Sequence, residues 1–319
     1  MAKILITGGA GFIGSQLGNN LDKQGHEVIL LDNMSFGHED NLVVDGKRFG
    51  TFILDDIRNK SLFEHMKGVD YVFHFAGIAP LPNCQEDPYE AVEINVAGTA
   101  NVLEACRVNG VKRIIFASTS AIYENNDLFP CKEADEVYPD LIYATTKLQC
   151  EHLCNAFTNS YGMDIVCLRF FNVYGPHQDF KRGGTPILHS DGNQKRDYVY
   201  VDDLLEMCNI VMSHDKAPGN IFNVSSGIPI SVRDIVDEIS SNFEKVSMPT
   251  YRSADLFWEK YSNLFEGKYP LKMERLNKEV NKYSKGCVIK SSEILGWKAK
   301  TSLEEGFKNT VEYAIKMGI

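Results

Sequence analysis

Residues 3–14 read KILITGGAGFIG, and this stretch decides the fold. Its centre, Ile4-Leu5-Ile6, is a short apolar run typical of a strand that is buried on both faces of a parallel sheet. Three glycines at positions 8, 11 and 14 come next and lead into a segment with helical spacing of its apolar residues. A buried strand, a glycine-rich turn and a helix together form the first unit of a doubly wound α/β fold.

Similar apolar runs recur along the first half of the chain at residues 27–31, 51–54, 71–75, 113–118 and 164–170. Most are separated by segments with apolar residues every three or four positions, such as 88–108 and 142–161. Strands that alternate with helices indicate a parallel sheet covered on both faces. We therefore predict a Rossmann-type sheet in residues 1–172, to which segments from about 202–242 return, and a smaller α/β lobe in residues 173–319.

The second half has a less regular pattern, with helices predicted over 202–213 after an Asp cap, 231–243, 255–264, 271–281 and 302–316. The composition is that of an ordinary globular protein, with 44% hydrophobic and 24% charged residues among 319. A net charge of −10 argues against a nucleic-acid partner. No apolar run approaches the roughly 18 residues of a membrane span, so we expect no membrane partner.

The N-terminal residues and the cysteines bear on the cellular compartment and on metal binding. The N-terminus enters a strand directly and has no signal-like segment, so we expect the protein to be cytoplasmic. The eight cysteines are scattered, without a CxxC pair or a Cys/His cluster. We therefore expect buried, reduced thiols and no metal site.

The glycine-rich turn suits a dinucleotide. Gly8 permits the tight turn, Gly11 lets the backbone approach a pyrophosphate, and Gly14 allows close packing of helix on strand. Asp32 ends the second predicted strand, where its carboxylate can hydrogen-bond a ribose diol. Because a carboxylate there would repel a ribose phosphate, these residues predict NAD rather than NADP.

Further motifs follow in order along the chain: DDIR at 55–58, HFAG at 74–77, NVAGT at 95–99, STSAIY at 118–123, YATTK at 143–147, RFFNVYGP at 169–176 and RDYVYVDD at 196–203. With the GxxGxxG spacing of the glycines, they make the chain resemble the extended short-chain dehydrogenase/reductase family, in its NAD-dependent nucleotide-sugar epimerase/dehydratase branch. The resemblance covers nearly the whole chain. It implies a nucleotide-sugar substrate, most simply a UDP-sugar, bound by residues of the smaller lobe. It also implies a homodimer in which helices 88–108 and 142–161 of two subunits form a four-helix bundle.

The resemblance also assigns binding residues. Those for the cofactor are Gly8, Gly11, Phe12, Ile13, Gly14, Asp32, Asn33, Asp56, Ile57, Phe75, Ala76, Gly77, Asn95, Ser118, Tyr143, Lys147 and Phe171. Asp56 and Ile57 are expected to flank the adenine. Asn172 and Arg196 match positions that contact the nucleotide diphosphate, since an Arg fork suits a phosphate. Arg275 is a further candidate for a phosphate contact.

The catalytic candidates are Thr119, Tyr143 and Lys147. Tyr143 and Lys147 are four residues apart at the start of a predicted helix, so both side chains point into one cleft. An ordinary tyrosine has a pKa near ~10, too high for an efficient base at neutral pH. We expect the Lys147 cation to lower the pKa of Tyr143 and also to hold the nicotinamide ribose. The hydroxyl of Thr119, at the end of the fifth strand, can bond the substrate oxygen that gains or loses a proton.

The residues after Thr119 favour one reaction within the branch. Dehydratases that resemble this chain carry an Asp-Glu pair directly after the Thr, and UDP-glucuronate decarboxylases typically read STSEVY. Ser120 and Ala121 follow Thr119 here, so no acid is present for a second proton transfer. This predicts a nucleotide-sugar 4-epimerase, which oxidises the sugar transiently and returns hydride to its other face. The alternatives are a 4,6-dehydratase or UDP-glucuronate decarboxylase on the same scaffold and, outside enzymes, an NAD-sensing binding module.

Two departures from the family concern the sugar and the base. Between the positions of Pro176 and Pro186, relatives usually carry an extra helix that helps to hold the base, and this chain lacks that helix. Either the nucleotide site is more open or residues are missing from this segment, so the identity of the base is not predicted. Counting back from Trp297 aligns Ser284 with a position that gates N-acetylated sugars in UDP-galactose 4-epimerases. Its small side chain favours room for an acetamido group, although a slip of one residue to Tyr283 would reverse this hypothesis.

Overall fold

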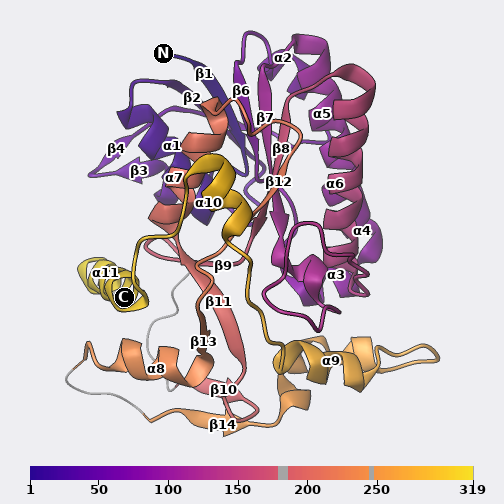
Figure 1. The fold of residues 1–319 in the computed structure, drawn as a ribbon, viewed down its shortest axis with the longest axis vertical. Helices are drawn as coiled ribbons and strands as arrows, with labels where there is room; N and C mark the ends of the chain where they lie inside the picture. Colours follow the sequence, from indigo (N-terminus) through magenta and orange to yellow (C-terminus); the bar gives the residue numbers. More distant parts are fainter. Residues whose placement is uncertain (179–185, 244–247, 319) are drawn as a thin grey trace.

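The computed structural model describes residues 1–178, 186–243 and 248–318. Its centre is a seven-stranded sheet in the order β12-β8-β7-β6-β1-β2-β5, and every strand pairing in it is parallel (Figure 1). Its strands are β1 (Lys3–Thr7), β2 (Glu27–Asp32), β5 (Thr51–Leu54), β6 (Tyr71–His74), β7 (Arg113–Thr119), β8 (Ile165–Phe170) and β12 (Ile221–Val224). The chain begins at the interior strand β1 and winds outward in both directions, which confirms the predicted doubly wound fold.

Helices cover both faces of this sheet. Figure 1 shows α1 (Phe12–Lys23) and α7 (Val201–Ser213) on one side, and α5 (Gly98–Asn109) and α6 (Ile142–Tyr161) on the other. The side chains of β1 explain why both faces need a cover. Ile4 and Ile6 belong to the apolar cluster on the α1 and α7 side, and Leu5 belongs to the cluster on the α5 side. Successive residues of a strand point to opposite faces, so a strand covered twice reads as a continuous apolar run.

The smaller lobe lies at the carboxyl ends of the sheet strands, in the lower part of Figure 1. It contains a three-stranded sheet in the order β13-β11-β9 and a two-stranded pair, β10 with β14. Its elements are β9 (Asn172–Tyr174), β10 (Ile187–His189), β11 (Lys195–Tyr200), β13 (Pro229–Ser231), β14 (Thr250–Arg252), α8 (Val232–Ser240), α9 (Met273–Val280) and α11 (Leu303–Lys316). Three short helices that the sequence did not predict are α2 (Leu62–His65), α3 (Leu81–Glu86) and α10 (Ile289–Leu295).

The helix predicted over 88–108 is confirmed as an unbroken helical run over residues 88–109, but it has three parts. These are α4 (Pro88–Val92), the π-helical turn η2 (Glu93–Ala97) and α5. Within the π-helical turn Asn95 makes two hydrogen bonds to the backbone of Ile78, at 2.9 and 3.1 Å. Wide turns of this kind inside a helix are often found at functional sites. This one turns Asn95 inward, beneath the loop that follows β6.

The helix starts and ends also differ from the predictions in two places. The predicted Asp cap of the 202–213 helix is wrong: α7 begins after Tyr200, and Asp202 and Asp203 both lie in its first turn. The helix predicted over 255–264 is two short 3-10 turns, η4 (Ala254–Leu256) and η5 (Glu259–Phe265). Buried Trp258 lies between these two turns and packs in an apolar cluster of the lobe.

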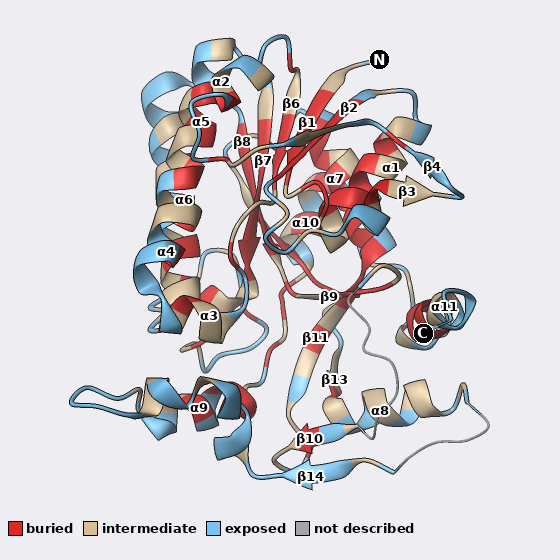
Figure 2. Cartoon of the chain, turned by 180° about the vertical axis from the view of Figure 1, so that it is seen from behind, coloured by how far each residue is buried: buried red, intermediate tan, exposed pale blue. Residues whose placement is uncertain are grey.

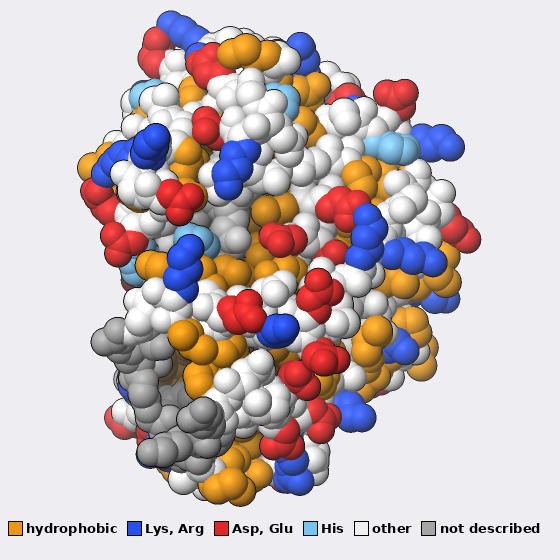
Figure 3. All heavy atoms as spheres, turned by 90° about the vertical axis from the view of Figure 1, so that its left-hand side faces the viewer, with side chains coloured by type: hydrophobic (Ala, Val, Ile, Leu, Met, Phe, Trp, Pro, Cys, Tyr) orange, Lys and Arg blue, Asp and Glu red, His pale blue; other side chains and the backbone are white. Residues whose placement is uncertain are grey.

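Some surface features bear on the expectations about partners and compartment. All eight cysteines are free and buried. On the face shown in Figure 3, acidic and basic side chains are interspersed. Among the described helices none combines the length and apolar character needed to cross a membrane. The family helix that the sequence lacks between Pro176 and Pro186 falls on residues 179–185, which lie outside the described ranges.

A buried ion pair fastens α6 to the sheet. The guanidinium of Arg169 on β8 donates to both oxygens of Glu151 on α6, at 2.9 and 2.7 Å. Both residues are 3% exposed, and Figure 2 shows the surrounding strands as a continuous buried region. The hydroxyl of Ser118 on β7 also donates to Glu151. Because α6 carries two catalytic candidates, this pair sets their height above the ends of β7 and β8.

Replacing Arg169 with methionine tests this fastening. Arg169→Met leaves the Glu151 carboxylate buried without its counter-ion, so we expect the free energy of unfolding to fall by about 3–5 kcal/mol in urea titration. The control is Arg107→Met, which removes the half-exposed pair of Arg107 with Glu104 and should cost below about 1 kcal/mol. Equal losses in the two variants would contradict the structural role given to the buried pair.

Candidate active site

A groove runs along the carboxyl ends of the sheet strands, and two adjoining cavities form it. They share five lining residues: Gly8, Gly11, Phe75, Gly77 and Ile78. The first cavity extends toward β2 and β5, over Asp32, Asn33, Asp56 and Ile57. The second extends toward β7 and β8, over Phe12, Ile13, Gly14, Ser118, Thr119, Tyr143, Lys147 and Phe171. The groove therefore crosses the point between β1 and β6 where the strand order reverses, which is where open α/β sheets bind ligands.

The glycines at the middle of the groove let backbone segments approach more closely than any side chain would permit. Gly8 has a φ of +72°, and a Cβ there would lie 2.8 Å from the backbone nitrogen of Ala76. At Gly14 a Cβ would lie 2.2 Å from the carbonyl oxygen of Gly8. Helix α1 starts after Gly11 with no capping side chain. Its first N–H groups therefore face the groove, where they can bind an anion.

The far end of the first cavity is acidic. Asp32 accepts hydrogen bonds from the backbone nitrogens of Ala10 (3.0 Å) and Met34 (2.8 Å), one on each carboxylate oxygen. Asn33 donates to Asp56 at 2.8 Å. Hydrogen bonds from Arg58 lower the pKa of Asp56 to about 2. Two carboxyl side chains at this end suit neutral hydroxyl groups better than a phosphate.

The second cavity brings the three catalytic candidates together. Thr119 ends β7, and its hydroxyl forms a hydrogen bond with the Tyr143 hydroxyl. Lys147, one turn further along α6, donates to the carbonyl oxygen of Ala117 at 2.9 Å and lies over the ring of Phe116. All three side chains line the cavity.

The expected lowering of the Tyr143 pKa is wrong for the chain by itself. Burial raises the pKa of Tyr143 to about 12, and the hydrogen bond with Thr119 offsets only part of this rise. Burial also lowers the pKa of Lys147. The physical reason is that desolvation disfavours the charged form of both groups, and the Lys147 ammonium bonds a backbone carbonyl rather than the phenol.

Two assigned residues lie behind the groove rather than on its wall. Asn95 is 2% exposed and lines neither cavity. It holds the wall through Ile78, and its amide oxygen lies where a Cβ of Gly77 would be only 2.8 Å away. Asn172 also lines neither cavity, and its amide donates to the Asp197 carbonyl at 2.8 Å.

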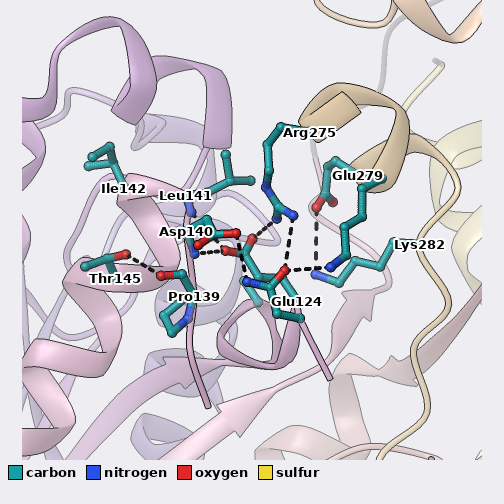
Figure 4. A network of polar contacts seen from close by, with 12 residues as sticks. Glu124, Pro139, Asp140, Leu141, Ile142, Thr145, Arg275, Glu279 and Lys282 are labelled. Carbon is teal, nitrogen blue, oxygen red and sulfur yellow. Dashed lines mark hydrogen bonds and ion pairs between the residues drawn. The ribbon is translucent and has the colours of Figure 1, made fainter. Parts of the chain in front are cut away.

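Arg196 on β11 and Arg275 on α9, the candidates for phosphate contacts, lie outside the two cavities, and Figure 4 shows Arg275 beside Glu124. Arg196 donates to the carbonyl oxygen of Glu279 at 2.6 Å and lies 3.4 Å from its carboxylate. Arg275, one turn earlier on α9, pairs with Glu124. Both guanidiniums are therefore already paired with groups of the chain, which neither motif predicted.

Several supporting residues were missed in the sequence. Asp197 is fully buried and accepts from the backbone nitrogens of Ser226 (2.9 Å), Gly227 (3.0 Å) and Gly286 (3.0 Å). An acid directly before the run Tyr198-Val199-Tyr200 of β11 was the signal that could have found it. Ser284, at 6% exposure, accepts from the Asp197 nitrogen at 3.2 Å. Its neighbour Tyr283 instead packs edge-on against Phe129 at the surface, so Ser284 is the inward residue of the two.

A second missed group lies under the groove. His74, at the end of β6, is fully buried between the hydroxyls of Thr7 (2.7 Å) and Thr99 (2.9 Å). Burial lowers its pKa to about 3, so the imidazole is neutral. Among the described residues no group of three His, Cys, Asp or Glu side chains is arranged to hold a metal ion.

Comparison with known proteins identifies relatives over the full length. Residues 4–225 match the family described as the NAD dependent epimerase/dehydratase family. The UDP-N-acetylglucosamine 4-epimerase of Methanobrevibacter ruminantium, solved with UDP-N-acetylmuramic acid, is 28% identical with a TM-score of 0.83 over 99% of each chain. The UDP-glucose 4-epimerase of Thermotoga maritima, solved with UDP-glucose, is 31% identical with a TM-score of 0.82 over 99% of this chain and 100% of that one. A UDP-N-acetyl-alpha-D-glucosaminuronate decarboxylase of Bacillus cytotoxicus is 29% identical over 98% of this chain and 97% of its own length.

The buried histidine gives a testable pH dependence. The unfolded chain takes up a proton on His74 below about pH 6.5, whereas the folded chain resists protonation until about pH 3. The free energy of unfolding should therefore fall with falling pH in this window, by up to about 1.4 kcal/mol per unit from this group. We expect His74→Gln to show a shallower fall than the parent in urea titrations between pH 6.5 and 4. The exposed control His152→Gln should keep the parent slope, and an unchanged slope in His74→Gln would refute the assignment.

Proposed function

The chain belongs to the NAD-dependent epimerase/dehydratase family, and we propose that it is a nucleotide-sugar 4-epimerase that acts through a transient 4-keto sugar. The observation that carries this proposal is the second cavity. The Thr119 and Tyr143 hydroxyls meet there with Lys147 beside them. Among the described residues, those that line this cavity include no Asp or Glu. Such a site has the groups to move one proton at one hydroxyl, which is what a 4-epimerase requires.

The groove fits NAD in the extended form. Gly8 and Gly11 line the groove at the start of α1, where we assign the pyrophosphate, and Gly14 lets the helix pack closely on the turn at Gly8. Asp32 lines the end of the groove that we assign to the adenine ribose. Lys147 is placed for the nicotinamide ribose at the other end. NAD, when bound, supplies the hydride acceptor that oxidises carbon 4 of the sugar and then returns the hydride to the other face of that carbon.

The side chains of the second cavity handle the proton. Thr119 and Tyr143 bind the 4-hydroxyl of the sugar, and Tyr143, ionised to the phenolate, takes the proton of that hydroxyl and later gives it back to the same oxygen. The phenolate is unfavourable in the chain alone, where burial raises the pKa of Tyr143 to about 12. The positive charge of Lys147, one turn away, therefore acts in the direction that catalysis needs.

The alternatives need a group that this cavity lacks. Elimination of water requires a second acid–base residue at the sugar, and Ala121 contributes only a methyl group at the family position. Glu124 is the next acid along the chain, but its oxygens accept from the nitrogens of Asp140 and Leu141 and from Arg275. This favours the epimerase over a dehydratase or a decarboxylase.

The substrate side supports a UDP-sugar. The named relatives bind or act on UDP-sugars, and Asn172, Arg196 and Arg275 are the residues of this chain that we assign to the diphosphate. The small, inward Ser284 is consistent with an acetamido group on the sugar. We also propose a homodimer through α4, α5 and α6, where the aromatic side chains of Tyr89 and Tyr161 are exposed and could pack against a second subunit.

Replacing the proposed base should abolish turnover while the protein stays loaded. Tyr143→Phe removes the proton acceptor, and we expect a loss of about 10²–10⁴-fold in kcat with unchanged NAD content. Tyr269→Phe, which removes a hydroxyl from a side chain that is 87% exposed, is the matched control and should retain full activity. Parent-level turnover in Tyr143→Phe would exclude the proposed role. Loss of NAD from that variant would instead point to a binding role.

The substrate assay uses the purified protein without added NAD. We expect UDP-glucose, UDP-N-acetylglucosamine or both to convert to the galacto sugar at unchanged mass. NMR and mass spectrometry monitor this conversion. Conversion of both would support the acetamido hypothesis for Ser284, and rejection of UDP-N-acetylglucosamine would refute it. A product lighter by water or carbon dioxide would establish one of the alternatives. Full recovery of both substrates with NAD bound would contradict the proposed substrates.

A further inference from the structure

Glu124 is a buried carboxylate with contacts to both lobes, and its side chain is 1% exposed. It follows the short turn η3 (Ser120–Tyr123), which begins directly after Thr119. One carboxylate oxygen accepts from the backbone nitrogens of Asp140 and Leu141, and the other accepts from Arg275 on α9 (Figure 4). A buried charge with this many partners is costly to disturb.

The first oxygen of Glu124 holds the start of the catalytic helix. Leu141 is the residue before α6 and provides no side-chain cap of its own. Glu124 accepts from its nitrogen at 2.8 Å, and Gln85 of α3 accepts from the nitrogen of Ile142 at 2.7 Å. Acceptors, and negative charge above all, stabilise a helix N-terminus. Tyr143 lies one residue beyond Ile142, so its backbone position depends on these two side chains.

The second oxygen holds Arg275 in a specific way. The guanidinium donates to Glu124 through one terminal nitrogen and lies 3.4 Å from the Asn125 amide oxygen through the other. Its Nε is buried and has no hydrogen-bond partner among the described residues. Nε is therefore the donor nitrogen of this guanidinium that no described residue uses, and it is the one that we assign to a phosphate oxygen. The same helix packs against Leu141 through Leu276 and Val280.

The balance of charges around α9 favours the binding of an anion. Three cations lie together, Arg196, Arg275 and Lys282, with Lys282 3.8 Å from the Glu279 carboxylate. Two carboxylates, Glu124 and Glu279, face them. The cluster therefore carries one excess positive charge in a partly desolvated position, where an anion is attracted more strongly than at the surface.

We propose that Glu124 is a positioning residue that couples the phosphate contact of the substrate lobe to the placement of Tyr143. A diphosphate on the Nε of Arg275 fixes the guanidinium, Arg275 fixes Glu124, and Glu124 fixes the first turn of α6. This inference rests on the proposed function, because it takes the diphosphate of a nucleotide sugar as the anion. Substrate phosphates would thereby contribute to catalysis at a hydroxyl that they do not touch.

Hydrogen exchange with UDP as the probe tests the coupling without turnover. We expect UDP to slow exchange of the backbone amides of residues 140–147 in the parent protein. The effect should be absent in Arg275→Met and in Glu124→Gln when UDP is present at saturating concentration. Lys272→Met, which removes an exposed cation directly before the same helix, is the control and should keep the protection. Protection that persists in Arg275→Met, absence of protection in the parent with UDP bound, or no binding of UDP to the parent would each overturn the inference.

Steady-state kinetics provides the second readout. We expect Arg275→Met and Glu124→Gln each to lower kcat at saturating substrate by about tenfold or more, and the double variant to lose no more than the worse single variant, because both break one chain of contacts. A change confined to KM in Arg275→Met, or losses that multiply in the double variant, would overturn the coupling. Should Glu124→Gln fail to fold, Arg275→Met alone decides the question, since this variant keeps the Glu124 carboxylate and its bonds to the start of α6. An inactive parent that still shows the UDP-dependent protection would contradict the proposed function and leave the coupling standing.

Discussion

The backbone of Gly8 lies so close to Ala76 that a Cβ at position 8 would be 2.8 Å from the Ala76 nitrogen. This contact joins the turns after β1 and β6, the two neighbouring strands between which the sheet order reverses. Only a residue without a side chain can occupy the position, and its φ of +72° imposes the same requirement. The two cavities of the groove adjoin at this contact, because both are lined by Gly8, Phe75 and Gly77.

The side chains that we propose as catalytic are positioned by buried polar bonds rather than by surface loops. Helix α6 is attached to the sheet by Glu151 with Arg169 and by Lys147 with the carbonyl of Ala117. Its first turn is attached by Glu124, which also reaches the substrate lobe. Each of these buried groups has a hydrogen-bond partner, as desolvation requires. The consequence is a rigid Tyr143 whose phenol is hard to ionise without help, so the reaction depends on cations brought near it.

The strands and the groove could be predicted from the sequence because local signals determine them. Apolar runs such as Ile4-Leu5-Ile6 require burial on both faces, and the glycine spacing requires a close backbone approach at Gly8. The resemblance brought the catalytic trio to one cavity before any geometry was known. These features are encoded within a few consecutive residues, so a single sequence suffices to read them.

The remaining features depend on contacts between distant parts of the chain. The π-helical turn in the 88–108 segment follows from Asn95 bonding Ile78, and no spacing of apolar residues encodes it. Arg275 pairs with Glu124, 151 residues away in the chain, so the partner of this cation was invisible to motif reasoning. The pKa of Tyr143 was misjudged because spacing reveals a nearby lysine but not the burial that outweighs it. Tertiary burial, rather than local pattern, decides the electrostatics of the site.

The most direct test of the central claim follows the hydrogen on carbon 4 of the sugar. UDP-glucose carrying deuterium at carbon 4 is incubated with the protein, and the UDP-galactose formed is analysed by NMR and mass spectrometry. Transient oxidation at carbon 4 predicts that the product keeps the deuterium at that carbon, because the hydride returns to the atom it left. Exchange of the label for solvent hydrogen, or its appearance at another carbon, would contradict the account.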